Sequence, residues 1–183
     1  MPFMTKAQTL PADVDTMNRL ANLTHVGVSV HALVKLPSDG NSMTQADSAV
    51  YYLGDDGRRQ AFPNANVYTS WYENFTTIRT VNGTDLASIP LGDNVIYRPG
   101  VKLVKFLSIP NVYAVSGDRS LRWIKSESVA QDLYGMNWRT MVDDIEDTFY
   151  MDYRMNLGDV VQSTSDYSPA TMRATYTYPS QVL

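Results

Sequence analysis

Short runs of alternating apolar and polar residues cover most of the chain, and turn-forming residues close nearly every run. Alternation with a period of two predicts β-strands. The clearest case is 50–63, where Val50-Tyr51-Tyr52-Leu53 and Gln60-Ala61-Phe62 flank an Asp56-Gly57 pair. Asp-Gly between two apolar runs is a strong hairpin signal. Other strands are predicted at 26–36, 76–81, 101–107, 138–142 and 171–178.

Apolar residues spaced by three or four positions predict helices elsewhere. The first of these runs predicts a short helix at 13–24, with Asp13 or Pro11 at its start. Further helices are predicted at 64–72, at 86–89 behind the capping residues Gly83-Thr84-Asp85, and at 126–135. The acidic stretch 143–153 is predicted to be a turn or a helix.

The hairpin pattern occurs twice, and its second copy is 112–124. Three pairs of segments align in the same order, namely 32–36 with 102–106, Val50-Tyr51 with Val112-Tyr113, and 91–95 with 157–161. The matched positions are mostly apolar or turn-forming, so we interpret them as framework positions. Two copies are too few for an open solenoid, and a pseudo-symmetric pair fits the length better.

These elements predict a β-rich α+β fold. Each unit contains a hairpin, a helix, a strand and a turn, with unit 1 at 32–95 and unit 2 at 96–161. Extended terminal arms flank the pair. Residues 1–31 form an N-terminal arm with a short helix or strand, and 162–183 form a C-terminal arm that ends in a strand.

One run, Tyr97-Arg98-Pro99-Gly100-Val101-Lys102-Leu103-Val104-Lys105, carries a specific family signal. Weaker stretches of the same kind lie at 33–37, 49–64, 70–72, 80–81, 85–87, 112–115, 121–124 and 142–145. Together they resemble a tandem-repeat family of secreted and cell-surface proteins that is frequent in candidate-phyla bacteria. The resemblance spans roughly 32–157. It implies an extracellular, non-catalytic setting and assigns no functional residues.

Composition narrows the function further. The chain has 183 residues, of which 44% are hydrophobic and 19% charged, and this is ordinary for a globular protein. A net charge of -4 argues against nucleic acid or an anionic membrane surface as a partner. The absence of cysteine excludes disulfides, thiolate nucleophiles and cysteine metal sites. No apolar run reaches the roughly 18 residues of a membrane span, and no signal peptide is visible.

The aromatic and arginine residues of the two hairpins are the candidate ligand-binding residues. Aromatic faces can stack on sugar rings, and alternation along a strand leaves one side of each hairpin exposed. Trp71 and Tyr72 lie on a helix face, which favours a role in the core. The candidate residues are Tyr52, Arg59, Tyr113, Arg122 and Trp123.

A polar loop offers a weak calcium candidate. Asp39, Asn41 and Asp47 place oxygen ligands within one loop. Calcium prefers six to eight oxygens, and the spacing departs from the EF-hand because Gly40 follows the first aspartate. A loop held by local side-chain hydrogen bonds is the favoured interpretation, so no metal and no cofactor is expected.

Two groups of titratable residues are candidates for catalysis. A glycosidase needs two carboxylates that face one cleft, whereas a dense acidic run is more typical of a solvated helix start. Two histidines alone make no convincing zinc site, and no nucleophile elbow accompanies them. No catalytic residue is therefore expected. The residues concerned are Asp143, Asp144, Glu146, Asp147, His25 and His31.

The sequence thus favours a non-enzymatic extracellular or cell-surface structural module that assembles with copies of itself, or with other surface proteins, into a filament or a surface layer through its terminal arms. The alternative is a carbohydrate or cell-wall binding module that uses exposed hairpin aromatics to bind a glycan. A hydrolase built on the acidic cluster is a third and more distant class.

Overall fold

Two mixed β-sheets carry the fold, and the same four-strand pattern is found in each. The computed structural model describes residues 13–41, 43–44, 46–155 and 160–182. Sheet A has the order β3-β2-β1-β4, and sheet B has the order β8-β5-β6-β7-β9. With helices on both sheets, the fold is α+β, as the sequence predicts. The strands are β1 (Leu33–Lys35), β2 (Tyr51–Leu53), β3 (Arg59–Ala61), β4 (Arg79–Thr80), β5 (Leu103–Phe106), β6 (Tyr113–Val115), β7 (Ser120–Trp123), β8 (Val142–Ile145) and β9 (Arg154–Met155).

Most helices begin at the capping residues that the sequence offers. Asp13, Asn64 and Ser126 each accept a hydrogen bond from the backbone N–H three residues later, which satisfies a free donor of the first turn. Gly135 ends the third of these helices. The helices are α1 (Val14–Val26), α2 (Ala65–Trp71), α3 (Gly83–Ser88), α4 (Glu127–Tyr134) and α5 (Pro169–Thr175), with 3₁₀ turns η1 (Trp138–Met141), η2 (Asp147–Asp152) and η3 (Pro179–Gln181).

Strand register confirms the internal repeat. In both sheets a central strand pairs antiparallel with the hairpin and parallel with a later strand, so β1, β2, β3 and β4 correspond to β5, β6, β7 and β8. The closing segments also match, because the N–H of Val95 donates to Ala61 and the N–H of Val161 donates to Trp123. Tyr52 of unit 1 therefore occupies the position of Ala114 in unit 2.

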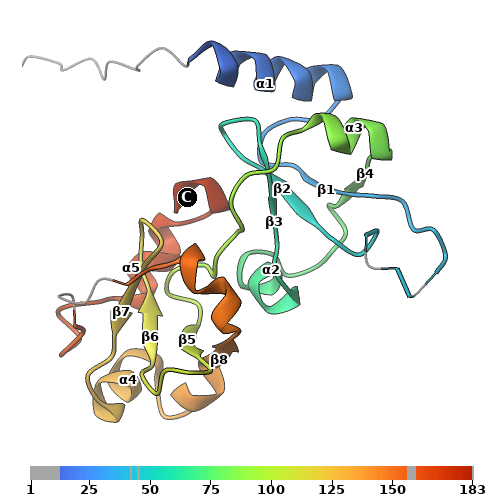
Figure 1. Ribbon diagram of the computed structural model, residues 1–183. Coiled ribbons are helices and arrows are strands. Elements are labelled where there is room, and N and C mark those ends of the chain that lie inside the picture. Colours follow the sequence, from blue (N-terminus) through green and yellow to red (C-terminus); the bar gives the residue numbers. More distant parts are fainter. Residues whose placement is uncertain (1–12, 42, 45, 156–159, 183) are drawn as a thin grey trace, which may run out of the picture.

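The two units are stacked head to tail. The α2-bearing face of sheet A, with Leu33 and Tyr52, belongs to the same buried cluster as Val104 and Phe106, which lie on the face of sheet B away from α4. Leu103, on the α4 side of sheet B, belongs to a separate cluster. Figure 1 shows the resulting order, with α1 and α3 beyond sheet A, α2 between the sheets, and α4 beyond sheet B.

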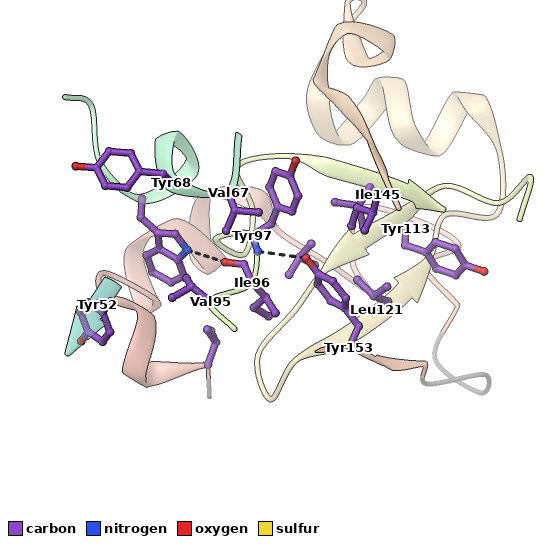
Figure 2. Packing of buried hydrophobic residues seen from close by; sticks show 14 of the residues in the cluster. Tyr52, Val67, Tyr68, Val95, Ile96, Tyr97, Tyr113, Leu121, Ile145 and Tyr153 are labelled. Atoms are coloured by element: carbon purple, nitrogen blue, oxygen red, sulfur yellow. Dashed lines mark hydrogen bonds between the residues drawn. The ribbon is translucent and has the colours of Figure 1, made fainter. Parts of the chain in front are cut away.

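The connection between the units is itself part of the core. Val95, Ile96 and Tyr97 are buried and lie between the two groups of side chains (Figure 2). The backbone N–H of Tyr97 donates to the hydroxyl of Tyr153 at 3.4 Å, and the Ile96 carbonyl accepts from the indole of Trp71 at 2.8 Å. Contacts of this kind join the units into a shared apolar layer.

The C-terminal segment differs from the sequence prediction. The alternation at 171–178 predicts a terminal strand, but Pro169–Thr175 is helical. Ser168 caps this helix and Pro169 occupies its first turn, which is where proline favours a helix. The alternation was therefore misleading, because Met172 and Tyr176 are spaced by one helical turn as well as by an even number of residues.

Two other strand predictions were too long. Helix α1 continues to Val26 and ends at Gly27 in the left-handed conformation, so only Leu33–Lys35 remains a strand within 26–36. In 138–142 the first residues form η1, and the strand β8 begins at Val142. Within the acidic stretch 143–153, the first residues belong to strand β8 and most of the later ones form the 3₁₀ turn η2. Residues 1–12 of the predicted N-terminal arm lie outside the described residues.

Candidate functional site

The hairpin aromatics are largely interior. Tyr52 and Tyr113, which the sequence suggested as exposed sugar-stacking rings, are both buried, so that prediction is wrong for these two residues. Tyr52 is fully covered, its hydroxyl lies 3.0 Å from Ser180 Oγ, and burial raises its pKa to about 12. Tyr52 and Tyr113 belong to the buried cluster that the two units share, and a single hairpin sequence cannot reveal this packing.

The three remaining hairpin candidates do not converge on one site. Arg59 donates to the carbonyl of Leu86 and lies over the ring of Tyr51. Arg122 donates to the carbonyl of Asp166 at 2.5 Å, on the α4 side of sheet B. Trp123 is 38% exposed on the opposite side. The five suggested residues therefore do not form a common binding surface.

A different pocket opens beside the turn of the first hairpin. Its volume is about 220 Å³, and its lining comes from the hairpin, the closing segment of unit 1 and η3. Gln60 is only 6% exposed, and its Oε1 has no hydrogen-bond partner. The lining residues are Asp55, Asp56, Gln60, Asp93 and Ser180.

Next to this pocket, His31 fixes the C-terminal segment to the first hairpin. Its Nε2 lies 2.5 Å from Oδ1 of Asp55, and its ring packs between Tyr52 and Tyr178 at centroid distances of 5.8 and 4.3 Å. Ser180 Oγ accepts from the backbone N–H of Asp55 at 3.2 Å. The sequence alone could not bring these residues together.

An aromatic groove of about 340 Å³ lies between the ends of the first hairpin and helix α2. Phe75 stacks on Tyr68 with a centroid distance of 4.4 Å and an angle of 7°, and Phe62 meets Tyr68 edge-on at 5.1 Å. Phe75 is 55% exposed, so one ring face is open to solvent. Ser48 and Asn64 supply polar groups to the same lining.

The polar loop after β1 is held by its own side chains. Both oxygens of Asp39 accept hydrogen bonds, one from the N–H of Asn41 and one from the hydroxyl of Thr44. Asp47 accepts from the N–H of Asp39, and this bond lowers the pKa of Asp47. No group of three or more metal-binding side chains is found among the described residues. The local side-chain hydrogen bonds that the sequence predicts are therefore present in this loop.

Three carboxylates in and beside the acidic run each bind a different residue of the fold. Asp143 lies on β8 and pairs with Lys102 at 3.1 Å, whereas Asp147 accepts from the N–H and the hydroxyl of Ser108. Asp152 accepts from the side-chain amide of Asn94 at 3.0 Å. These carboxylates join segments of the fold, and the interpretation as a helix start was wrong for the part in β8.

Sequence reasoning missed both pockets. Gln60 and Asp93 gave no motif, and Ser180 lies in a segment that was assigned to an arm. Two signals were available in the repeat itself. Gln60 stands where unit 2 has Arg122, and Tyr68 stands where it has Ala130, each four residues after the cap of its helix. Positions that differ between copies are better candidates for specific roles than positions that agree.

Comparisons with protein family models, with curated proteins and with solved structures give no match. Among the described residues, no helix is long and apolar enough to cross a membrane. The candidate sites therefore rest on their own geometry, and the family resemblance stays a prediction.

Proposed function

We propose that this chain is a non-enzymatic structural module of an extracellular or cell-surface assembly. The observation that supports this proposal is the use of its buried polar side chains. They bind backbone carbonyls and carboxylates of distant segments, and in doing so connect unit 1, unit 2 and the C-terminal segment.

Arg119 is the clearest example. Arg119 as a whole residue is 9% exposed. Its guanidinium donates to the carboxylate of Asp93 at 2.7 Å, to the Asp152 carbonyl at 2.7 Å and to the Asn94 carbonyl at 3.2 Å. Charge-assisted bonds of this kind are stronger than neutral ones. The turn of the second hairpin is thereby fastened to the closing segment of unit 1.

The C-terminal segment is fastened in the same way. Arg98 donates to the carbonyls of Tyr176 and Arg173 at 2.8 Å each, and Arg173 donates to the Gly100 carbonyl at 2.6 Å. Tyr167 donates to the Val115 carbonyl at 2.7 Å. The segment therefore docks on its own chain, and it closes the outer face of unit 2.

Assembly of copies would extend the stacking already used within the chain. Contact between unlike faces is heterologous, and a heterologous contact that does not close gives an open filament. Since the C-terminal segment is engaged within its own chain, the proposal assigns contact between copies to the outer surfaces and to residues 1–12.

Light scattering over a range of concentrations tests the proposal. A mass above 20.5 kDa that rises with concentration is expected, and removal of residues 1–12 should lower it. Negative-stain microscopy should then show chains or sheets of particles. A mass of one protomer at every concentration would remove self-assembly from the proposal.

The aromatic groove favours glycan binding as a second candidate function. An open ring face beside polar groups suits a sugar, whose apolar face can stack on the ring. Soluble chitin oligomers and purified cell-wall material are suitable probes. Phe75→Ala should weaken retention on either, whereas Leu107→Ala, which removes another exposed apolar side chain, should leave it unchanged. Equal retention for both variants would sink this candidate.

A further inference from the structure

The link between helix α2 and strand β4 carries an inference that deepens the proposed function, and it rests on the extracellular setting proposed above. We propose that Asn74 in this link is an acceptor site for an N-linked oligosaccharide. Three observations support this assignment: a sequence motif, the hydrogen bonds of the Asn74 side chain, and the contrast with two other asparagines in the same motif.

The motif is an asparagine followed two residues later by serine or threonine, with a residue other than proline between them. It is the acceptor sequence for N-linked glycosylation. Three segments of this chain fit it, and they begin at Asn22, Asn74 and Asn82. The motif alone is therefore a weak signal. The three sites differ in what each side-chain amide already binds.

Asn74 is exposed, and the turn holds its side chain by the oxygen. Oδ1 accepts from the backbone N–H of Thr76 at 3.0 Å and from the Thr76 hydroxyl at 2.5 Å. A backbone N–H can only donate, so this bond fixes which end of the amide faces the turn. The amide nitrogen has no hydrogen-bond partner among the described residues. Both groups that define the motif thus lie together, and the nitrogen that would carry the sugar is free.

The other two asparagines use the same nitrogen within the fold. Asn82 caps helix α3, and its Nδ2 donates to the carboxylate of Asp85 at 2.7 Å. Asn22 is half-buried on α1, and its Nδ2 lies 3.0 Å from the carbonyl oxygen and 3.2 Å from the hydroxyl of Ser88. Transfer of a sugar to either nitrogen would break these contacts, so Asn74 is the best acceptor of the three.

The turn itself is held in place by helix α2. The hydroxyl of Tyr68 donates to the Asn74 carbonyl at 2.7 Å, and the ring of Phe75 stacks on that of Tyr68. Phe75 is 55% exposed and lines the aromatic groove. The surface beside Asn74 therefore has room for a bulky group, and an open ring face of this kind can stack on a sugar.

Unit 2 lacks the motif at the corresponding link. Asn137 and Trp138 follow helix α4 in the same order, but Arg139 stands where unit 1 has Thr76. Arg139 pairs with Glu127 and lies over the ring of Trp138. Without a hydroxyl two residues later, Asn137 is a control site within the same chain.

The transfer step needs one co-reactant, a lipid-linked oligosaccharide diphosphate. The amide nitrogen of Asn74 forms a bond to the anomeric carbon of the first sugar, and the bond between this carbon and the diphosphate oxygen breaks. The amide loses one proton, which the released lipid diphosphate takes up. No oxidant or reductant is involved.

Modification of the folded full chain tests the proposal. The chain is incubated with a single-subunit oligosaccharyltransferase that accepts the plain Asn-X-Thr motif and with its lipid-linked oligosaccharide, and modified sites are identified by mass spectrometry. A peptide with the sequence of residues 71–79 confirms that the enzyme is active. Occupancy of Asn74 should exceed that of Asn22 and Asn82 by about tenfold, since those two amides must first give up hydrogen bonds. Asn137 should carry no sugar.

Matched variants complete the test. Asn74→Gln and Thr76→Val should each abolish the modification, whereas Thr76→Ser keeps the hydroxyl and should retain it. Asn82→Asp removes another copy of the motif but keeps the helix cap, and it should leave occupancy of Asn74 unchanged. Equal occupancy of the three motifs, or a modified peptide beside an unmodified folded chain, would overturn the proposal.

Failure of self-assembly is measured separately, by light scattering of the unmodified chain. A chain that is modified at Asn74 yet keeps the mass of one protomer would support the acceptor site and remove self-assembly. A chain that assembles but is not modified would do the reverse.

Discussion

Tyr52 and Tyr68 fill the helix-bearing face of sheet A from within unit 1 itself. The equivalent residues of unit 2 are the small residues Ala114 and Ala130, and the buried cluster around them is completed by Tyr167 from the C-terminal segment. Both units have the same strand register, yet one supplies its own large side chains and the other depends on a segment that follows it. The residues that the two copies share therefore determine the strand arrangement. The residues that differ determine whether a sheet face is filled by its own unit or by another segment of the chain.

The same comparison separates residues that maintain the fold from residues that line the candidate pockets. The two candidate pockets lie in unit 1 and use residues that unit 2 lacks, such as Gln60 and Tyr68. The corresponding places in unit 2 hold Arg122 and Ala130, which serve the docking of the C-terminal segment. Unit 1 is thus the better candidate for recognition, and unit 2 for attachment.

The largest expected effect comes from removing the ring of Tyr167, which the C-terminal segment contributes to the buried cluster of unit 2. Tyr167→Ala deletes a buried aromatic side chain and its hydrogen bond to Val115, so it should lower the free energy of unfolding by about 3–5 kcal/mol. Urea denaturation measures this. Tyr167→Phe keeps the ring and should lose only about 1 kcal/mol. A loss below that value for Tyr167→Ala would mean that unit 2 does not need the C-terminal segment.

The fit of helix α5 against unit 2 is tested by a pair of glycines. Gly100 and Gly135 both have positive φ, at 79° and 85°. A Cβ on Gly100 would lie 2.3 Å from the Pro169 carbonyl oxygen, whereas a Cβ on Gly135 would meet nothing within 4 Å. Gly100→Ala should therefore cost about 2–4 kcal/mol of stability and Gly135→Ala about 1 kcal/mol. Equal losses would show that α5 does not press on this turn.

The link between the units is tested by two arginines. Arg119→Ala removes three hydrogen bonds and leaves two partly buried carbonyls unpaired, so a loss of about 2–3 kcal/mol is expected. Arg154 pairs with Asp118 at an exposed position, and Arg154→Ala should change stability by less than about 0.5 kcal/mol. Thermal denaturation compares the two variants, and similar losses would contradict a special role for Arg119.

Alkaline pH should destabilise the fold through its buried tyrosines. Burial raises the pKa of Tyr52 and of Tyr167 from 10.0 to about 12. The folded state favours the neutral phenol, so this stability is complete below pH 10 and is lost as pH rises towards 12. Tyr52→Phe should flatten the pH dependence in that window. Ser180→Ala removes a hydrogen bond that lowers the pKa of Tyr52 but keeps the phenol, so the pH dependence should persist in this variant.

The smallest effect concerns calcium. Because the oxygens of Asp39 and Asp47 are used within their loop, millimolar calcium should not shift the thermal transition. Asp39→Asn should not alter the response to calcium either. A calcium-dependent rise in the transition temperature that disappears in this variant would restore the loop as a metal site.

The local elements could be predicted where the chain carries its own signals. Asp56-Gly57, Asn64, Ser126 and Gly135 each fix a turn or a helix end through backbone chemistry that needs no distant partner. The repeat also predicted which strands of the two units correspond, because equivalent residues pair with equivalent neighbours in both sheets.

The remainder depends on contacts between distant segments. Alternation shows that a strand has two faces but not that both are covered, so Tyr52 and Tyr113 were placed on the wrong side. The polar pocket joins Gln60, Asp93 and Ser180, which nothing in the local sequence relates. The C-terminal helix could have been recognised from its cap, Ser168-Pro169. Its position could not, because it depends on the close approach of Pro169 to Gly100, where a side chain would clash.

The central claim is that both units and the C-terminal segment form one cooperative body. The indole N–H signals of Trp71 in unit 1 and Trp138 in unit 2 report on each unit in the unaltered chain. Followed by nuclear magnetic resonance through a urea titration, both signals should disappear with the same midpoint. Separate midpoints, with Trp138 lost first while Trp71 persists, would contradict the claim.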